Sequence, residues 1–200
     1  MTRWVLRAAA EQAVSWADRG WNLTAGVNVS PAHLATGTLV DDVRAVLTAS
    51  GLPPDRLVVE ITETCLVGDT GSAADQLATL REDGVRIAID DFGAGYSSLS
   101  AVASLPADVL KVDRSLVAVL PPASVSAAEA VLTAAAALGR ALGMHVVAEG
   151  VETPEQLDRV RRAGCDWGQG FLFSGPVPAE GLHGLLTAGP EGSGLRWSTA

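Results

Sequence analysis

Residues 85–91 of the chain have the sequence VRIAIDD, a run of apolar residues that ends in two adjacent carboxylates. Nearly continuous apolar runs are typical of parallel strands buried on both faces. Four similar runs carry polar or charged residues at their carboxyl ends: AGVNVS (25–30), LVVEITE (57–63), VLKVD (109–113) and HVVAEGVE (145–152). Burial of a carboxylate costs several kcal/mol, so this many at strand ends require a compensating cation. The repetition predicts a divalent-metal site.

The segments between these runs carry helix signals. Ser30-Pro31 is a helix cap followed by proline at the first helical position, and residues 153–156 match a capping box. Glycines at the ends of the helical patterns predict left-handed terminators. Helices are expected at residues 5–16, from 31, at 40–50, 74–83, 98–104 and 126–142, and from 154 to 163. A final strand is expected over DWGQGFLF, residues 166–173.

Six strands separated by helices predict an α/β fold with a parallel sheet and right-handed crossovers. The polar residues at the strand ends follow one another at intervals of 20 to 38 residues, about one strand and one crossover each. In a closed (β/α) barrel all carboxyl ends meet at one face, whereas an open doubly wound sheet spreads them along an edge. We favour the barrel, although six strands are fewer than the usual eight.

The composition is that of one globular domain, because 200 residues with 48% hydrophobic content can bury a sizeable core. A formal net charge of -9 argues against a protein that holds DNA or RNA on a basic surface. Cys65 and Cys165 match no metal-ligand spacing and are interpreted as structural thiols. No signal peptide or membrane segment is recognisable, so a cytoplasmic location is expected.

Six strings carry a family resemblance: NVS, EITET, DDFGAGYSSL, LPADVLKVDRS, VVAEGVET and QGFLFSGPVP. In this order they resemble the EAL domain family of bacterial cyclic-di-GMP phosphodiesterases, over about residues 3 to 184. The Glu-Ala-Leu signature and the family's first two strands are not in the sequence. The resemblance therefore implies an N-terminally truncated TIM-like (β/α) barrel of EAL type with about six of eight strands. Residues 1–185 are assigned to this partial domain and 186–200 to a C-terminal tail.

The resemblance implies a site for Mg²⁺ or Mn²⁺, with two metal ions in the complete domain. Asn28, Glu60 and Asp90 resemble ligands of the first ion. Asp91 resembles the carboxylate of the second position, and Glu149 resembles a residue that holds that ion or the nucleophilic water. Both ions prefer hard oxygen ligands. We expect the first four side chains to converge at the carboxyl ends of the strands.

Lys111 resembles the family's essential lysine, a compact cation suited to stabilise developing negative charge, and is assigned with Glu149 to catalysis. Glu63 resembles the residue that anchors the glycine-containing loop after Asp91. Substrate contacts are implied for three residues: Asp113, Glu152 and Gln169. Asp113 lies two residues beyond Lys111, so an ion pair between them is also plausible.

Each of the main site residues also has a structural explanation. Asn28 fits a turn, and Asp90 or Asp91 could cap a short helix. Lys111 could extend its ammonium group to solvent, and Glu149 lies near a helix start, where its charge is favourable. The combination favours a shared metal site, because six separate strands supply compatible chemistry.

Three functions remain open from the sequence. The first is metal-dependent hydrolysis of cyclic di-GMP to the linear dinucleotide, impaired in this chain by the missing strands. The second is binding of cyclic di-GMP without turnover, and the third is a protein-interaction module. A homodimer and an upstream sensory or cyclase domain are further partners that the resemblance implies.

Overall fold

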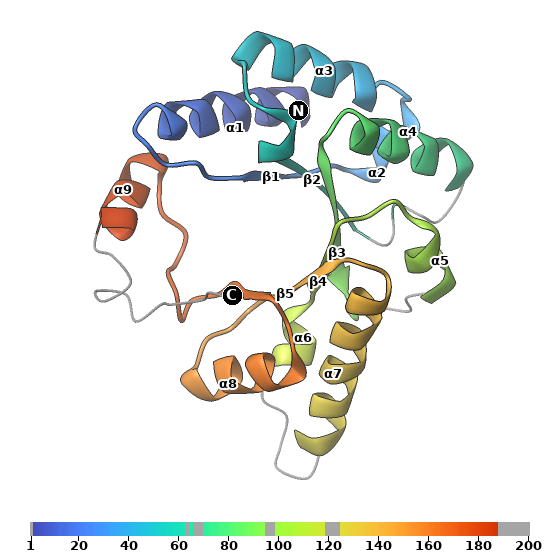
Figure 1. Ribbon diagram of the computed structural model, residues 1–200, viewed down its shortest axis with the longest axis vertical. Coiled ribbons are helices and arrows are strands. Elements are labelled where there is room, and N and C mark those ends of the chain that lie inside the picture. The colour runs from blue at the N-terminus through green and yellow to red at the C-terminus, as the bar shows by residue number, and fades with distance from the viewer. Residues whose placement is uncertain (1, 63–64, 66–69, 95–98, 119–124, 188–200) are drawn as a thin grey trace. The chain divides into compact units, whose positions relative to one another are not determined.

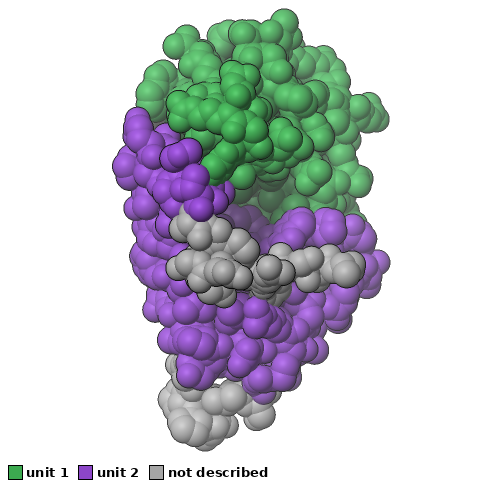
Figure 2. Space-filling view, turned by 60° about the vertical axis from the view of Figure 1, so that its left-hand side comes forward, with its two compact units in different colours: residues 1–110 green, residues 111–200 purple. Residues whose placement is uncertain are grey.

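The computed structural model describes residues 2–62, 65, 70–94, 99–118 and 125–187. The chain divides into two compact units, residues 1–110 and 111–200, coloured separately in Figure 2. Both units alternate strands with helices, as the sequence predicted (Figure 1).

Unit 1 contains parallel strands whose hydrogen-bonded neighbours follow chain order from β1 to β4. Its elements are α1 (Thr2–Ala17), β1 (Ala25–Asn28), α2 (Pro31–Ala35), α3 (Leu39–Ser50), the 3₁₀ helix η1 (Pro54–Arg56), β2 (Leu57–Thr62), α4 (Thr70–Glu82), β3 (Arg86–Phe92) and α5 (Leu99–Ser104). The strand β4 (Val109–Val112) crosses the boundary into unit 2. The helices expected in this part of the chain are confirmed.

The two faces of the unit 1 sheet differ in character. Val27, Val59 and Ile87 lie on one face and are at most 2% exposed. Helix α1 packs on β1 and α4 packs on β3. Each buried aliphatic side chain contributes about 1.5–3 kcal/mol relative to an exposed one. Asn28 and Glu60 lie on the opposite, more accessible face, so this face carries the polar residues.

The helix boundaries in unit 1 follow the expected signals. The Ser30 hydroxyl accepts a hydrogen bond from the His33 N–H at 3.3 Å and caps α2. Helix α3 ends at Gly51, which has φ 72° and donates its N–H to the Leu47 carbonyl. Glycine adopts this left-handed conformation without the penalty of a Cβ.

An aspartate closes the amino end of a strand pair in each unit. The Asp108 N–H donates to the Ile87 carbonyl, and the Asp108 carboxylate accepts the Ile87 N–H at 2.9 Å. Asp166 makes the same two bonds with Val146, its carboxylate accepting that N–H at 2.7 Å. These carboxylates satisfy backbone donors that would otherwise end the ladder without a partner.

Unit 2 begins within β4, whose hydrogen-bonded neighbour is β5, and β5 pairs in parallel with β6. Its further elements are α6 (Arg114–Val117), α7 (Val125–Ala141), β5 (His145–Ala148), α8 (Pro154–Ala163), β6 (Trp167–Gly168) and α9 (Ala179–Thr187). Helix α7 packs on β5, α6 and α8. The long helix and the capped helix that the sequence predicted are confirmed, whereas α9 was not predicted.

The final strand is shorter than the sequence predicted. A strand was expected over residues 166–173, but β6 covers only Trp167–Gly168. The chain then turns, and the Phe173 N–H donates to the Gly170 carbonyl at 3.0 Å. Gly170 comes so close to the Val151 backbone that an added Cβ would overlap the Val151 carbonyl oxygen. After this close approach, residues 171–173 form a turn and do not continue the strand.

Among the described residues, no helix combines the length and apolar character that crossing a membrane requires. Helix α9 ends the described part of the chain at Thr187. The domain boundary after residue 185 therefore stays a prediction, and most of the predicted tail lies outside the described residues.

Thr153 and Gln156 form the predicted capping box of α8. The Thr153 hydroxyl accepts the Gln156 N–H at 3.3 Å, and the Gln156 side-chain oxygen accepts the Thr153 N–H at 3.0 Å. We expect Thr153→Ala to lower the free energy of unfolding by about 1 kcal/mol in urea titrations followed by circular dichroism. Thr133→Ala, on the exposed side of α7, is the matched control and should have no effect or be slightly stabilising. Equal losses in the two variants would contradict the capping role.

Candidate functional site

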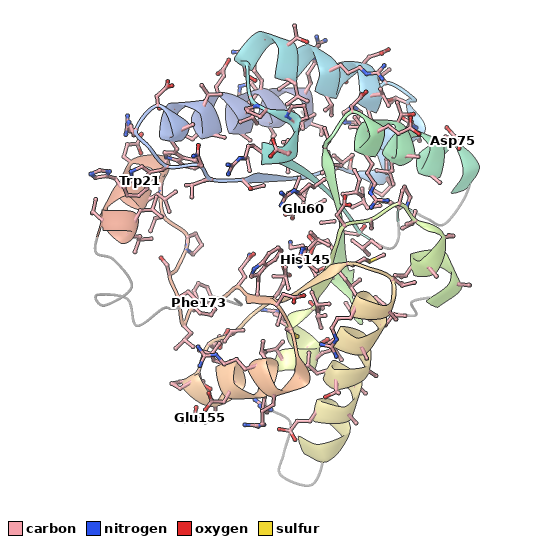
Figure 3. All side chains as sticks on the ribbon, in the orientation of Figure 1. Trp21, Glu60, Asp75, His145, Glu155 and Phe173 are labelled. Carbon is pink, nitrogen blue, oxygen red and sulfur yellow. The ribbon has the colours of Figure 1, made fainter. Side chains whose placement is uncertain are left out.

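Three predicted metal ligands lie on adjacent strands of unit 1. Asn28 at the end of β1 is the register partner of Glu60 on β2, and Thr62 is the partner of Asp90 on β3. Register partners share a face, as do residues two positions apart in one strand. Asn28, Glu60 and Asp90 therefore point to the same side near the carboxyl ends of their strands. Figure 3 labels Glu60 on β2.

The burial of these side chains increases from β1 to β3. Asn28 is exposed, Glu60 is half-buried and Asp90 is only 7% exposed. The Asp90 carboxylate accepts a hydrogen bond from the N–H of Asp91 at 3.1 Å. Burial of an ionised carboxylate costs several kcal/mol, which a nearby positive charge can offset. The environment of Asp90 thus favours a positive charge nearby.

Gly26 makes room for the Glu60 carboxylate. An added Cβ at Gly26 would overlap the Glu60 Oε1 atom. Gly26 lies two residues before Asn28 on β1, on the same face of the strand. Gly26 was not among the site residues predicted from the sequence. Its period-two spacing from Asn28 was the available signal, but glycine in a strand has other common explanations.

Asp91 has a left-handed backbone with φ 58°, the one positive φ at a non-glycine residue in the described ranges. Regular alternation would place Asp91 on the helix-covered face beside Ile89. Instead its side chain is exposed. Left-handed conformations of non-glycine residues cost free energy and cluster at functional sites. The carboxylates of Asp90 and Asp91 each have an oxygen within 4.8 Å of the other, close enough to share a metal ion, as the sequence predicted.

Glu63 and residues 95–98 of the loop after Asp91 lie outside the described residues. The predicted anchoring of that loop by Glu63 stays a prediction. The described part of the loop ends with Ala94, whose N–H donates to the Asp91 carbonyl at 3.2 Å.

The two predicted catalytic residues form an ion pair within unit 2. The Lys111 Nζ atom on β4 lies 2.7 Å from Glu149 Oε1, and the two side chains are 10% and 18% exposed. The Glu149 N–H donates to the Val112 carbonyl at 3.0 Å, which fixes the residue at the end of β5. The pairing of β4 with β5 therefore places the Glu149 carboxylate beside the Lys111 ammonium group.

Asp113 begins a helix. Its carboxylate accepts the Ser115 N–H at 2.9 Å and caps α6. Burial acts to raise the pKa of Asp113, but hydrogen bonds from Ser115 and the Arg114 N–H outweigh it, so the pKa lies below its ordinary value. Asp113 is therefore an ionised carboxylate whose hydrogen bonds hold the turn after β4.

An open pocket of about 420 Å³ lies within unit 2, between the loops that follow β4, β5 and β6. It brings together Glu152 and Gln169, both predicted to contact substrate, with Arg114 and Phe171. The Phe171 ring is 67% exposed. Gly150, with φ 68°, lets the loop after β5 lie close to Arg114, because an added Cβ would overlap the Arg114 side chain. Arg114 and Phe171 were not predicted from the sequence, because no single segment shows which loops meet at the pocket.

The ion pair of Lys111 and Glu149 generates a stability prediction. Lys111→Met leaves a poorly solvated carboxylate without its cation and should lower the free energy of unfolding by about 3 kcal/mol. The double variant Lys111→Met/Glu149→Gln should lose less, because the remaining charge is removed. Urea unfolding at neutral pH measures both.

The exposed pair of Arg162 and Glu129, at 3.0 Å, supplies the control. Arg162→Met should change stability by no more than about 1 kcal/mol. Additive losses for Lys111 and Glu149 in the double variant would show that the two side chains do not depend on each other.

Comparisons of the chain with known proteins agree with the family that the sequence motifs predicted. The model of the EAL domain family matches residues 1–176. MucR of Pseudomonas aeruginosa, a bifunctional diguanylate cyclase/cyclic di-GMP phosphodiesterase, is 43% identical over 182 residues, which are 90% of this chain and 26% of MucR. NbdA of the same organism, a cyclic di-GMP phosphodiesterase, is 41% identical over 188 residues, 92% of this chain and 24% of NbdA. The chain spans about a quarter of the length of the curated relatives it matches.

Solved structures also resemble the fold of this chain. The EAL domain of Mycobacterium smegmatis DcpA has a TM-score of 0.87 and 40% identity, covering 94% of this chain and 85% of that one. The MucR phosphodiesterase in complex with c-di-GMP has a TM-score of 0.82 and 42% identity, covering 90% and 72%. A manganese and cyclic di-GMP complex of Klebsiella pneumoniae BlrP1 has a TM-score of 0.70 and 34% identity, covering 85% and 43%.

These matches confirm the fold class predicted from the sequence, the TIM-like (β/α) barrel of the EAL type, of which the described residues supply six strands. The family model covers most of the chain, and the matched range includes every predicted site residue. The chain belongs to the EAL domain family.

Proposed function

We propose that the chain is a metal-dependent phosphodiesterase domain that hydrolyses cyclic di-GMP to the linear dinucleotide. The observation that carries the proposal is the set of oxygen ligands on one sheet face, where Asn28, Glu60 and the buried Asp90 end consecutive parallel strands. Membership of the EAL family and the names of MucR and NbdA support the choice of substrate.

The side chains fit a hard divalent cation. Asn28, Glu60 and Asp90 offer only oxygen ligands from one face, which suits Mg²⁺ or Mn²⁺ better than a soft metal. The buried Asp90 carboxylate fits such an ion as well, because a cation offsets the cost of burying its charge. We assign these three residues to a first ion and Asp91 to a second. The manganese complex of BlrP1 supports the class of metal.

When bound, the ions would lower the pKa of a water nucleophile and neutralise charge on the phosphate oxygens. The chain's own residues supply the remaining functions. Lys111, held by Glu149 at 2.7 Å, is a fixed cation for the negative charge that develops on phosphate. The unit 2 pocket, with Glu152, Gln169 and Phe171, binds one guanine base and so orients the dinucleotide.

Other properties inferred from the family stay predictions. A cytoplasmic location and a homodimer are two of them. MucR joins a cyclase to its phosphodiesterase, and the chain covers 26% of MucR, which supports an accompanying domain in the full protein.

The proposal is tested by Mn²⁺ titration and by chromatographic assay of cyclic di-GMP cleavage. Glu60→Gln and Asp90→Asn should weaken Mn²⁺ binding at least 10-fold, since even outer-shell partners of a metal are worth 10- to 100-fold. Either variant, or excess chelator, should lower any cleavage by at least about 100-fold. Asp75→Asn, an exposed aspartate on α4 in the same unit, is the control and should change neither result (Figure 3).

Two results would contradict the proposal. Wild-type Mn²⁺ affinity in both Glu60→Gln and Asp90→Asn would remove the metal site. Binding of cyclic di-GMP without metal-dependent cleavage would instead support a binding module.

Gly26→Ala is a further test, because it acts on Glu60 without changing a ligand. The added methyl group would displace the Glu60 carboxylate and should weaken Mn²⁺ binding by about 10-fold. Gly184→Ala on α9, where an added Cβ meets nothing within 4 Å, is the matched control. Unchanged Mn²⁺ binding in folded Gly26→Ala would show that metal binding does not depend on the space that Gly26 leaves for the Glu60 carboxylate.

A further inference from the structure

Helix α2 carries the chain away from Asn28, and it is too short to be stable alone. It begins at Pro31 and has five residues, whereas an isolated helix needs about 12 or more. Its position therefore depends on contacts with other elements. Leu34 is 4% exposed, and the His33 Nε2 atom lies 3.0 Å from the Asp42 carboxylate on α3. The histidine contact ties α2 to α3.

Gln76 ties α2 to α4. The Gln76 Nε2 group donates to the Leu34 carbonyl at 3.1 Å and to the Ser72 carbonyl of its own helix at 3.2 Å. Gln76 is only 9% exposed. An open pocket of about 410 Å³ lies between the two helices, and several of its lining side chains are small, such as Ala32 and Ala73. Small side chains offer little apolar contact, so the hydrogen bond from Gln76 defines how α2 is placed on α4.

The oxygen of the same amide is unsatisfied. Gln76 Oε1 is buried and has no hydrogen-bond partner within the described part of the chain. The reverse orientation of the amide would place this oxygen against two carbonyl oxygens, so the amide cannot satisfy both of its ends here. A buried polar atom without a partner costs free energy, and a methionine of similar length would avoid that cost.

The two carbonyl groups do not require Gln76 as a donor. The Leu34 carbonyl also accepts the Gly37 N–H at 3.1 Å. Ser72 lies inside α4, where the regular helix pattern supplies its carbonyl with the N–H four positions further on. Loss of the Gln76 amide therefore leaves neither carbonyl without a partner, and it removes the unsatisfied oxygen. Stability alone does not explain a buried glutamine at this position, whereas the placement of α2 does.

We propose that Gln76 is a positioning residue for Asn28. Only Val29 and Ser30 separate Asn28 from α2, and Ser30 is itself held to α2, since its hydroxyl accepts the His33 N–H at 3.3 Å. A displacement of α2 is therefore carried to the end of β1, where it changes the orientation of the Asn28 side chain. This inference rests on the proposed function for the role of Asn28 and adds a buried residue on another helix that controls it.

The test compares Gln76→Met with the wild type in the 200-residue chain. Without metal, hydrogen exchange followed by NMR should be about 5-fold faster at the Leu34 and Gly37 N–H groups, the scale of one hydrogen bond. The Asn28 side-chain amide resonance should move. Mn²⁺ should bind about 10-fold more weakly, as for the loss of an outer-shell partner of a metal ligand. The midpoint of urea unfolding should stay the same or rise, because the unsatisfied oxygen is gone.

A double-mutant comparison separates positioning from a general structural role. In the Asn28→Ala protein, addition of Gln76→Met should change Mn²⁺ affinity by less than about 2-fold, because the side chain that Gln76 positions is absent. Gln12→Met removes the amide of a half-buried glutamine on α1 and is the matched control. It should change neither the exchange at α2 nor Mn²⁺ binding.

Unchanged exchange at α2 in Gln76→Met would overturn the inference, as would the same loss of Mn²⁺ affinity with and without the Asn28 side chain. Wild-type Mn²⁺ affinity in Gln76→Met would overturn it too, and a lower urea midpoint in that case would assign Gln76 to stability alone. Failure of the proposed function gives a different result. The wild type then binds no Mn²⁺, and the Asn28 amide resonance decides whether Gln76 positions this residue.

Discussion

Parallel hydrogen bonding between neighbouring strands is the constraint on which the polar site depends. Asn28, Glu60 and Asp90 come from segments about 30 residues apart, and the register of β1 to β3 places them on one face. A slip of one residue would turn a carboxylate toward the helices and expose an aliphatic side chain such as Ile87. Both changes cost free energy, so the packing of the helix-covered face fixes the geometry of the polar face.

The sequence predicted most elements because their signals are local. Apolar periodicity, the Ser30 cap and the capping box of α8 lie within a few residues of the structure that they specify. The error at β6 has a non-local cause, since the chain turns where Gly170 meets the Val151 backbone. Gly26 and Arg114 were missed for the same reason. Their importance comes from neighbours supplied by other strands and loops, which no single segment displays.

Asp113 shows how the end of a strand limits what the alternation of side chains can predict. Residues two apart in a strand share a face, which made an ion pair of Asp113 with Lys111 one expectation from the sequence. Strand β4 ends at Val112, however, and Asp113 already belongs to the cap of α6. Lys111 forms an ion pair with Glu149 from the next strand. Side chains alternate between the two faces only while the backbone remains extended. Strand β4 ends at Val112, one residue earlier than the sequence pattern suggested.

The opposite ends of the strands explain why carboxylates have different roles in this chain. At the amino ends, Asp108 and Asp166 find backbone N–H donors on Ile87 and Val146, and these donors satisfy them. At the carboxyl ends a parallel ladder finishes with carbonyl oxygens, which repel a carboxylate. Glu149 meets this condition by pairing with Lys111. A carboxylate at this edge therefore requires a cation, from a side chain or from a bound ion, and this requirement is the physical basis of a metal site there.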